Sequence, residues 1–357
     1  MKIGILTSGG DCPGLNAVIR AIGLYITENL PDAELLGIPD GYGGLIRGDF
    51  FPLKREDFAD ILNLGGTILG TSRQPFKQMT RPEEDGTSRL KKMVDNYRKS
   101  RLDCLFVLGG AGTHKNAALL SAEGSHVIGL PKTIDNDIYG TDMTFGFQTA
   151  VEVAVEAIDR IRTTAESHLR TMLIEVMGNK AGWLALHAGI AGGADVILLP
   201  EIPFSPDAVV EKVLRNREQG ERSSLIVVAE GAFLSDEAGL KKKERQFVRK
   251  ERGESTVTPH LAEILEERTG IETRATVLGY LQRGGTPSAY DRFLASRFGG
   301  EAARLCAAGH FGVTVALNGG NVVYNALSDI AGRYKPVDPK GEAVRFARDI
   351  GIFFGTK

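Results

Sequence analysis

The segment 130–137 (LPKTIDND) carries residue types that suit the transfer of a charged group to an alcohol. It follows an apolar run that we expect to be a strand, so it lies at the carboxyl edge of a sheet, where open α/β folds bind ligands. In an extended segment Asp135 and Asp137 face the same side, so one carboxylate could accept a hydroxyl proton while the other holds Mg²⁺ or a water. Lys132 and Thr133 add a cation and a hydroxyl for charge on a transferring phosphoryl group. The structural alternative is a solvated turn in which Asp and Asn side chains bond to the backbone.

Two glycine-rich turns each stand between an expected strand and an expected helix. The first, 8–11 (SGGD), follows Lys2–Thr7, and the second, 109–113 (GGAGT), follows Cys104–Leu108. Such a turn brings unhindered backbone N–H groups and the positive end of a helix dipole to one place, which suits phosphate. Neither turn has the P-loop or the dinucleotide-binding pattern, and either could serve only to reverse the chain. Together they indicate a highly phosphorylated ligand.

Four arginines stand in glycine-rich or otherwise uncharged surroundings. Guanidinium groups are the preferred clamps for phosphate oxygens, although an arginine taken by itself is more often a surface or ion-pair residue. Glu175 and Glu230 lie within or directly after apolar runs and could order a sugar hydroxyl or a neighbouring arginine. Glu175 could equally be a paired buried charge. The four arginines are Arg73, Arg170, Arg274 and Arg283.

The composition excludes several classes of function. The chain has 357 residues, with 43 Lys and Arg against 45 Asp and Glu, and this net charge of −2 excludes a histone-like or polybasic nucleic-acid binder. Hydrophobic residues at 42% and charged residues at 25% are typical of a globular protein, here of about two domains. Three separated cysteines, and histidines without a metal-binding pattern, argue against a disulfide framework and a zinc site. Because no signal-peptide core or membrane-spanning apolar run is present, we expect a cytoplasmic protein.

The elements that must position these residues alternate short apolar stretches with amphipathic ones, which is typical of βα units around a mostly parallel sheet. Ser205-Pro206 and Thr258-Pro259 each place a capping hydroxyl before a proline suited to a first helical turn. The charged stretch 241–252 is expected to be a solvated helix or loop rather than a nucleic-acid patch. Val313–Ala316 and Asn321–Tyr324 are predicted to form a hairpin. The other expected strands are His126–Leu130, Thr171–Val176, Val196–Leu199, Leu225–Ala229 and Thr273–Leu278.

Seven motifs, in order from Met1 to about Asn321, together resemble the 6-phosphofructokinase family. The most specific are TIDND at 133–137 and LGYLQRGG at 278–285. The resemblance implies an α/β fold of two similar three-layer domains with mostly parallel central sheets and the active site in the cleft between them. It implies a nucleotide domain of residues 1–146 plus 283–331 and a sugar-phosphate domain of residues 147–282 plus 332–357. The motifs are TSGGDCPGLNAVIR, GGTILGTSR, LGGAGT, LPKTIDNDIYGTD, EVMG, IAGGAD and ETRATVLGYLQRGG.

The activity that the resemblance implies is phosphoryl transfer from ATP, or in some branches from pyrophosphate, to the 1-hydroxyl of fructose 6-phosphate with Mg²⁺. By resemblance, Asp135 matches the catalytic base, Thr133 the hydroxyl beside the transferring group, and Asp137 a metal-site acid. A homodimer or homotetramer with sites shared across subunits is expected, with Arg170 supplied by a neighbour, and neither a membrane nor a nucleic acid is an expected partner. The matching donor positions are Gly9, Gly10, Arg73, Gly110, Gly112, Thr113 and Lys132, of which Arg73 is also a catalytic candidate. The matching acceptor positions are Thr133, Asp135, Arg170, Met177, Gly178, Asn179, Glu230, Arg274, Tyr280 and Arg283.

Donor choice and three departures from the family pattern leave alternatives open. Gly112 resembles ATP-dependent members, because an acidic side chain there would repel the α-phosphate, whereas Lys132 resembles the pyrophosphate branch. The pair is typical of a mixed-substrate group whose members usually use ATP, so ATP is favoured. Ala111 stands where most relatives carry an acid that helps to hold Mg²⁺, and a methyl group cannot coordinate a cation. A catalytically impaired binding homologue is therefore a second hypothesis. Asn179 and Tyr280 replace a common Arg and a common His, which raises a third: another acceptor, such as sedoheptulose 7-phosphate.

Overall fold

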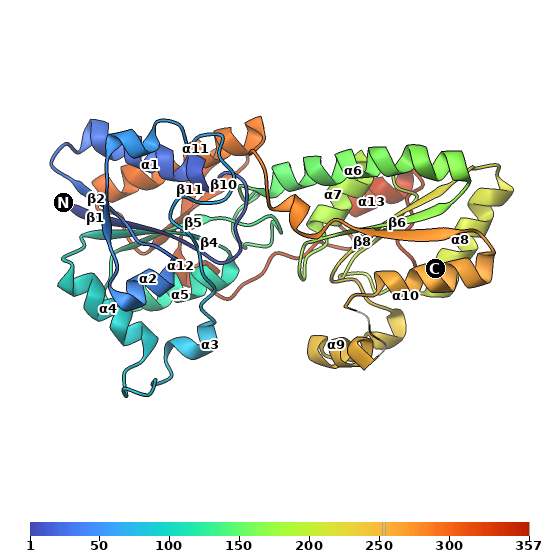
Figure 1. Ribbon diagram of the computed structural model, residues 1–357, viewed down its shortest axis with the longest axis horizontal. Coiled ribbons are helices and arrows are strands. Elements are labelled where there is room, and N and C mark those ends of the chain that lie inside the picture. The colour runs from blue at the N-terminus through green and yellow to red at the C-terminus, as the bar shows by residue number, and fades with distance from the viewer. Residues whose placement is uncertain (252, 254, 357) are drawn as a thin grey trace. The chain divides into compact units, whose positions relative to one another are not determined.

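The chain divides into two compact units, each with its own sheet and core. A computed structural model describes residues 1–251, 253 and 255–356 (Figure 1). The predicted division of nucleotide and sugar-phosphate binding between two domains stays a prediction. Unit one consists of Met1–Ile134, Ile138–Thr149 and Arg283–Lys335, and unit two of Asp135–Asp137, Ala150–Gln282 and Pro336–Lys357.

Unit one is built on a mostly parallel, seven-stranded sheet. Its order is β11 (Asn321–Ala326), β10 (Val313–Asn318), β5 (Val127–Pro131), β4 (Cys104–Gly109), β1 (Lys2–Ser8), β2 (Glu34–Gly37) and β3 (Phe51–Leu53). Only the outer pairs, β10–β11 and β2–β3, run antiparallel. Strands β1, β4 and β5 are almost wholly buried, which explains their uninterrupted apolar sequences. The parallel register pairs Ser8 with Gly109 and Gly109 with Pro131, so these three strands end at one edge.

Helices cover both faces of this sheet. They are α1 (Leu15–Asn29), α2 (Tyr42–Arg47), α3 (Phe76–Met79), α4 (Arg89–Lys99), α5 (Ala111–Ala122), α11 (Ala289–Ala307) and α12 (Leu327–Ile330), with a 3₁₀ turn at Arg55–Phe58. Figure 1 shows α1 and α11 on one face and α2, α4 and α5 on the other. In α1, Leu15, Val18 and Ile22 recur at helical spacing and are buried. A Cβ on Gly299 of α11 would come within 2.7 Å of the Val18 carbonyl oxygen, so glycine permits the close packing of α11 on α1.

Unit two is built on four parallel strands, in the order β7 (Val196–Leu198), β8 (Ser224–Ala229), β6 (Thr171–Val176) and β9 (Thr273–Val277). The central strands β6 and β8 are buried throughout, whereas β9 is an edge strand that exposes Arg274, Ala275 and Val277. Among the described residues, the structure has no helix that is both long and apolar enough to cross a bilayer. The helices of this unit are α6 (Phe147–His168), which begins in unit one, α7 (Trp183–Ala191), α8 (Pro206–Glu218), α9 (Lys242–Glu251), α10 (Thr258–Thr269) and α13 (Glu342–Asp349), with 3₁₀ turns at Ser235–Glu237 and Gly279–Gln282.

The predicted α/β class with mostly parallel sheets is confirmed, and every predicted strand is present with ends within two residues of those expected. The predicted hairpin is also present. Its two-residue loop consists of Gly319 and Gly320, both with positive φ, as a tight hairpin turn requires. The two sheets are unequal in size, and the short strands β2 and β3 were not predicted.

The predicted helix caps need correction. Ser205 is the N-cap of α8, but its side chain makes no capping hydrogen bond. Helix α10 begins at Thr258 itself, because Val257 already has helical dihedral angles and takes the N-cap position. Within the charged stretch 241–252, α9 is helical, and Arg252 lies outside the described residues.

Candidate active site

Three strand ends of unit one bring polar groups to one edge of its sheet. Strand β1 leads into the glycine turn 8–11, β4 leads into the turn 109–113, and β5 leads into Lys132. The Lys132 N–H donates to the Gly109 carbonyl oxygen at 3.0 Å, and its Nζ donates to the Gly10 carbonyl oxygen. Lys132 is only 3% exposed. A buried cation is therefore held against the first glycine turn, which favours the binding of an anion there.

The first turn favours glycine at both of its central positions, for two different reasons. Gly9 has a φ of 92°, in the left-handed region that residues with a Cβ rarely adopt. A Cβ on Gly10 would overlap the Arg283 guanidinium group. Arg283, predicted as an acceptor-site residue, thus lies in unit one, directly over the backbone of a predicted donor turn.

The second turn opens helix α5 and presents its N-terminus. Gly110 is the N-cap, and Ala111 is the first helical residue. A Cβ on Gly109 would clash with the Thr113 side chain, while a Cβ on Gly112 would meet no atom within 4 Å. The Thr113 hydroxyl donates to the Ser8 carbonyl oxygen at 3.3 Å, which ties the two turns together. The unpaired N–H groups of a first helical turn suit a phosphate oxygen.

The His114 side chain is hydrogen-bonded to the second turn. Its Nδ1 donates to the Gly110 carbonyl oxygen at 3.0 Å, and its Nε2 therefore accepts from the Thr314 hydroxyl, also at 3.0 Å. The pKa of His114 is lowered from 6.5 to about 4, mainly by burial and in part by the nearby charge of Lys132. The ring is consequently neutral near pH 7.

Arg73 lies on a segment that is hydrogen-bonded to the first turn. The Gly9 N–H donates to the Ser72 carbonyl oxygen at 3.1 Å, and the Thr71 hydroxyl donates to the Gly9 carbonyl oxygen at 2.7 Å. The Arg73 side chain is exposed. The structure therefore brings together Gly9, Gly10, Arg73, Gly110, Gly112, Thr113 and Lys132 at the carboxyl edge of one sheet.

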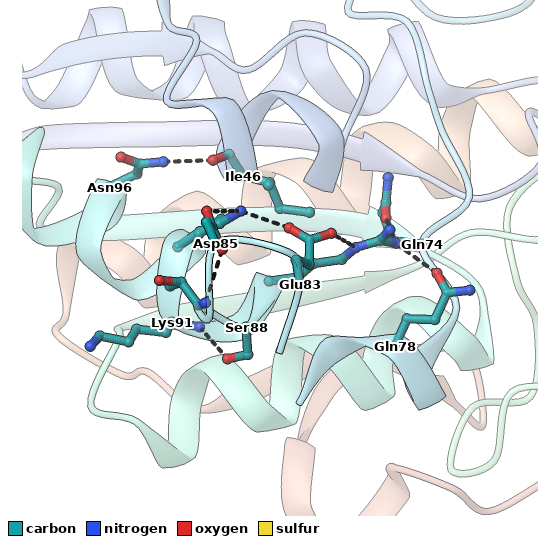
Figure 2. A network of polar contacts seen from close by, with 11 residues as sticks. Ile46, Gln74, Gln78, Glu83, Asp85, Ser88, Lys91 and Asn96 are labelled. Atoms are coloured by element: carbon teal, nitrogen blue, oxygen red, sulfur yellow. Dashed lines mark hydrogen bonds and ion pairs between the residues drawn. The ribbon is translucent and has the colours of Figure 1, made fainter. Parts of the chain in front are cut away.

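A polar network beyond Arg73 anchors the same segment (Figure 2). Arg89 donates through Nη1 to Oε1 of Gln74 and of Gln78, each at 2.8 Å, and through Nε to Glu83 at 2.8 Å. Lys92 joins Glu83 to Asp85. These lysine and arginine partners lower the pKa of Glu83. The network fixes the backbone on the C-terminal side of Arg73.

The segment 133–137 does not have the extended conformation that the sequence suggested. Asn136 has a φ of 50°, so alternation along an extended chain does not place Asp135 and Asp137 on one side. Asparagine tolerates this left-handed conformation better than most residues do. The Thr144 hydroxyl donates to the Thr133 carbonyl oxygen at 2.7 Å. Asp137 is buried and Asp135 is half-buried.

In unit two, the loop after β6 carries three predicted acceptor residues. The Met177 N–H donates to Oε1 of Gln282 at 3.3 Å, and the Asn179 N–H donates to Oε1 of Glu230 at 2.7 Å. Gly178, between them, has a φ of 136°, which favours glycine. Glu230 follows β8, the strand beside β6, so both approach from the carboxyl ends of parallel strands.

Glu175 is part of the interior of unit two. It is 4% exposed, and its Oε2 accepts from the Thr256 hydroxyl at 2.6 Å. Burial raises its pKa, and the charge of Glu230 adds to this shift. Of the roles considered for Glu175, the structure thus supports a buried, hydrogen-bonded one.

Arg170 and Arg274 lie together, at the opposite end of the unit-two sheet from Met177. Arg170 bonds to Glu272 at 2.8 Å, and Arg274 bonds to Glu272 at 2.7 Å. The Arg170 guanidinium lowers the pKa of Glu272. Arg170 precedes β6 and Met177 follows it, so the two α-carbons are separated by more than about 20 Å at roughly 3.3 Å per strand residue.

A profile of the phosphofructokinase family matches residues 2–306. The chain belongs to this family. A curated relative from Spirochaeta thermophila, named ATP-dependent 6-phosphofructokinase, is 52% identical over 99% of this chain and 97% of its own. A relative from Amycolatopsis methanolica, named pyrophosphate–fructose 6-phosphate 1-phosphotransferase, is 47% identical over 99% of this chain and 100% of its own. The crystal structure of Pichia pastoris phosphofructokinase in the T-state matches with a TM-score of 0.77 and 34% identity, over 92% of this chain and 35% of that longer chain.

Carboxylate side chains are the groups with which this family member could hold Mg²⁺. The described residues contain no group of three or more His, Cys, Asp or Glu side chains that could hold a metal ion. Ala111 offers no ligand at the start of α5. Mg²⁺ in phosphate-transfer sites commonly takes one or two carboxylates and completes its shell with phosphate oxygens and water. The buried carboxylate of Asp137 fits a magnesium ion that arrives with its phosphate ligand.

Two residues that touch the candidate site were not identified from the sequence. His114 follows the GGAGT turn directly, and Gln282 lies inside the LGYLQRGG motif. The sequence around a single histidine or glutamine does not show which distant residues its side chain contacts. Thr314 and Met177 lie far from them in the chain, and only the fold brings each pair together.

Proposed function

We propose that this chain is an ATP-dependent 6-phosphofructokinase, which transfers the γ-phosphoryl group of ATP to the 1-hydroxyl of fructose 6-phosphate. The observation that carries the proposal is the meeting of two glycine turns, the α5 N-terminus and the buried Lys132 at one sheet edge. Such an arrangement suits a polyphosphate. The names of the relatives and their near full-length similarity support the reaction.

In the proposed reaction Asp135 accepts the proton of the sugar 1-hydroxyl as that oxygen attacks the γ-phosphorus. The bond from the γ-phosphorus to the bridging oxygen breaks, and ADP leaves. Arg73 and Lys132 would offset the charge on the moving group, and Thr133 would lie beside it. Phosphoryl transfer depends mainly on positioning and on electrostatic stabilisation, and these residue types supply both.

We propose ATP as the usual donor because Gly112 leaves open space beside the α5 N-terminus. Pyrophosphate is the alternative donor, supported by Lys132 and by the names of two relatives. Mg²⁺ would be held by Asp137 and the donor's own oxygens, and it would supply charge neutralisation of the polyphosphate. Because Ala111 removes a ligand, a catalytically impaired homologue remains the competing hypothesis.

We propose that the acceptor site is completed by a second copy of the chain. Met177, Gly178, Asn179 and Glu230 lie at the carboxyl end of the unit-two sheet, and Arg170 and Arg274 lie at its amino end. One chain cannot bring both sets to a single small sugar phosphate. Strand β9 lies at the edge of the unit-two sheet and is largely exposed, so a partner could pair with it. A cytoplasmic location stays a prediction.

A coupled assay tests the proposal. Purified protein is incubated with fructose 6-phosphate, saturating Mg²⁺, and either ATP or pyrophosphate, and fructose 1,6-bisphosphate is measured. We expect turnover with ATP to exceed turnover with pyrophosphate. No product with either donor would reject the kinase and leave the binding homologue. Competition between fructose 6-phosphate and sedoheptulose 7-phosphate at equal concentration tests the acceptor.

A further inference from the structure

Gln282 joins two segments of unit two that are proposed to bind the sugar phosphate. Its side chain is 0% exposed, at the end of the 3₁₀ turn Gly279–Gln282. The Met177 N–H donates to its Oε1 at 3.3 Å, and its Nε2 donates to the Gly279 carbonyl oxygen at 3.1 Å. A single amide therefore connects the loop after β6 with the turn that carries Tyr280.

The two hydrogen bonds need both the oxygen and the NH₂ group of a carboxamide. The Met177 N–H requires an acceptor, and the Gly279 carbonyl requires a donor. A glutamate in this place could accept from Met177 but would turn a second oxygen toward the Gly279 carbonyl, unless that carboxyl were protonated. A methionine of similar length would serve neither group and would leave both without this bond in the interior.

The connected segments hold the two positions at which the acceptor site departs from the family pattern, Asn179 and Tyr280. Glu230 holds the far end of the loop through the Asn179 N–H, and Gln282 holds the near end through the Met177 N–H. Gly279 has a φ of 50°, so its turn depends on a backbone conformation that other residues resist. Without the amide, the loop and the turn lose the side-chain connection that Gln282 provides.

We infer that Gln282 is a positioning residue for the acceptor: it fixes the loop 177–179 relative to the turn 279–282 and so determines the affinity for a phosphorylated ketose. This inference rests on the proposed function. Both hydrogen bonds of the Gln282 side chain go to backbone groups of unit two, so its loss is expected to change the affinity for the sugar phosphate more than the affinity for ATP.

The first test replaces Gln282 with methionine. For Gln282→Met we expect the KM for fructose 6-phosphate to rise by about tenfold or more while the KM for ATP stays within about twofold. Asn216→Ala is the matched control, because Asn216 is a buried amide on α8 of the same unit and bonds to neither segment. If Gln282 only supports folding, the control and Gln282→Met lose stability and activity alike, and the two KM values move together.

The second test uses Gln282→Glu and pH. Burial raises the pKa of a carboxyl group, so lowering the pH protonates this one and restores a donor toward Gly279. We expect the ratio of the variant's fructose 6-phosphate KM to the wild-type KM to be smaller at about pH 6.5 than at about pH 8.5. Measuring wild type at both pH values cancels the titration of the sugar phosphate itself. If Gln282→Met does not fold, the change of this KM ratio with pH is the deciding test of the inference.

The inference is overturned if folded Gln282 variants keep the wild-type KM for fructose 6-phosphate, or if the ratio does not change with pH. Failure of the proposed function is a separate result, namely that wild type forms no product. In that case calorimetric binding of fructose 6-phosphate replaces KM. Weaker binding by Gln282→Met than by wild type supports the inference, whereas equal binding, or no binding to wild type, overturns it.

Discussion

Asp135 is the proposed base, and its removal gives the most direct test at the scale of one residue. An asparagine in its place cannot accept the hydroxyl proton but keeps the size and polarity of the side chain. For Asp135→Asn we expect kcat to fall by about 10²–10⁴-fold with little change in the KM for fructose 6-phosphate, as for loss of a general base. Steady-state kinetics measures both. Asp236→Asn, at an exposed aspartate, is the control, and a fall in kcat below about tenfold contradicts the assignment.

Ala111, at the proposed metal site, is expected to weaken the binding of Mg²⁺. It is the first residue of α5, where an aspartate would also be stabilised by the helix dipole, so Ala111→Asp is expected to fold. We expect the variant to reach half-maximal rate at about tenfold less Mg²⁺ than wild type, because a carboxylate adds a ligand. Titration of the rate with Mg²⁺ at fixed ATP measures this. A wild-type rate already high at low Mg²⁺ and unchanged in the variant contradicts it.

Gly112 is expected to permit ATP as the donor because glycine places no charge beside the phosphates. The space around it admits a side chain without a clash. A carboxylate about 4 Å from a phosphate charge is repelled by roughly 4 kcal/mol at an effective dielectric constant near 20. For Gly112→Asp we therefore expect kcat/KM for ATP to fall by at least about a hundredfold, at about 1.4 kcal/mol per tenfold, while any rate with pyrophosphate is retained. Gly112→Ala, which adds bulk without charge, separates the two causes, and equal losses in both variants would show that charge is not responsible.

At the scale of an element, the N-terminus of α5 depends on a neutral histidine. The folded protein keeps His114 neutral down to a pKa of about 4, whereas the unfolded chain binds a proton near 6.5. Between these two pKa values the unfolded state binds more protons than the folded state does. The contribution of the neutral His114 ring to the free energy of unfolding is therefore complete above pH 6.5 and is lost as the pH falls toward 4.

Urea unfolding of wild type and His114→Gln at about pH 6.5 and about pH 5 measures that contribution. Wild type is expected to lose more stability than the variant over this interval, by up to about 1.4 kcal/mol per pH unit, because other titrating groups are common to both. Thr27→Val, at a part-buried hydroxyl of α1 that donates to backbone carbonyl oxygens, is expected to keep the wild-type pH dependence. If His114→Gln and wild type lose the same free energy of unfolding over this pH interval, the proposed role of the His114 ring is contradicted.

The central strands were predictable because their apolar sequences indicate that they are buried. Strands β1, β4 and β8 are mostly apolar and end at small residues, and a strand buried on both faces needs such a sequence. Strands β2 and β3 are too short to give a periodic signal. The Asp135–Asp137 segment was misjudged because alternation assumes an extended chain, and Asn136 leaves that conformation.

The residue types of the candidate site were predictable, but their partners were not. Glycine turns and Lys132 could be identified by type and place in the sequence. The contact of Arg283 with Gly10, and the bonds of Arg89 to Gln74 and Gln78, join positions that only the fold brings together. Likewise the separation of Arg170 from Met177 follows from the length and direction of β6, which no motif specifies.

At the scale of the whole molecule, the length of β6 requires that an acceptor site with all the proposed residues be shared between copies. In a symmetric dimer the same surface serves both chains, so each site would combine the Asp135 and Asn179 side of one chain with the Arg170 and Arg274 side of the other. A variant defective on one side and a variant defective on the other can then rebuild one intact site in a mixed dimer.

Mixing Asp135→Asn with Arg274→Ala, under conditions that exchange subunits, is therefore expected to restore activity that neither variant has alone. Random pairing makes half of the dimers mixed, and each mixed dimer has one intact site of two, so recovery should approach about a quarter of the wild-type rate. Arg170→Ala mixed with Arg274→Ala must not recover, because both defects lie on the same side and every site retains one of them. Size-exclusion chromatography with light scattering verifies the oligomer. A fully active monomer contradicts site sharing, because Arg170 and Arg274 would then act without a partner. Recovery in the control mixture contradicts the assignment of both arginines to one side, because one site would then take Arg170 from one chain and Arg274 from the other.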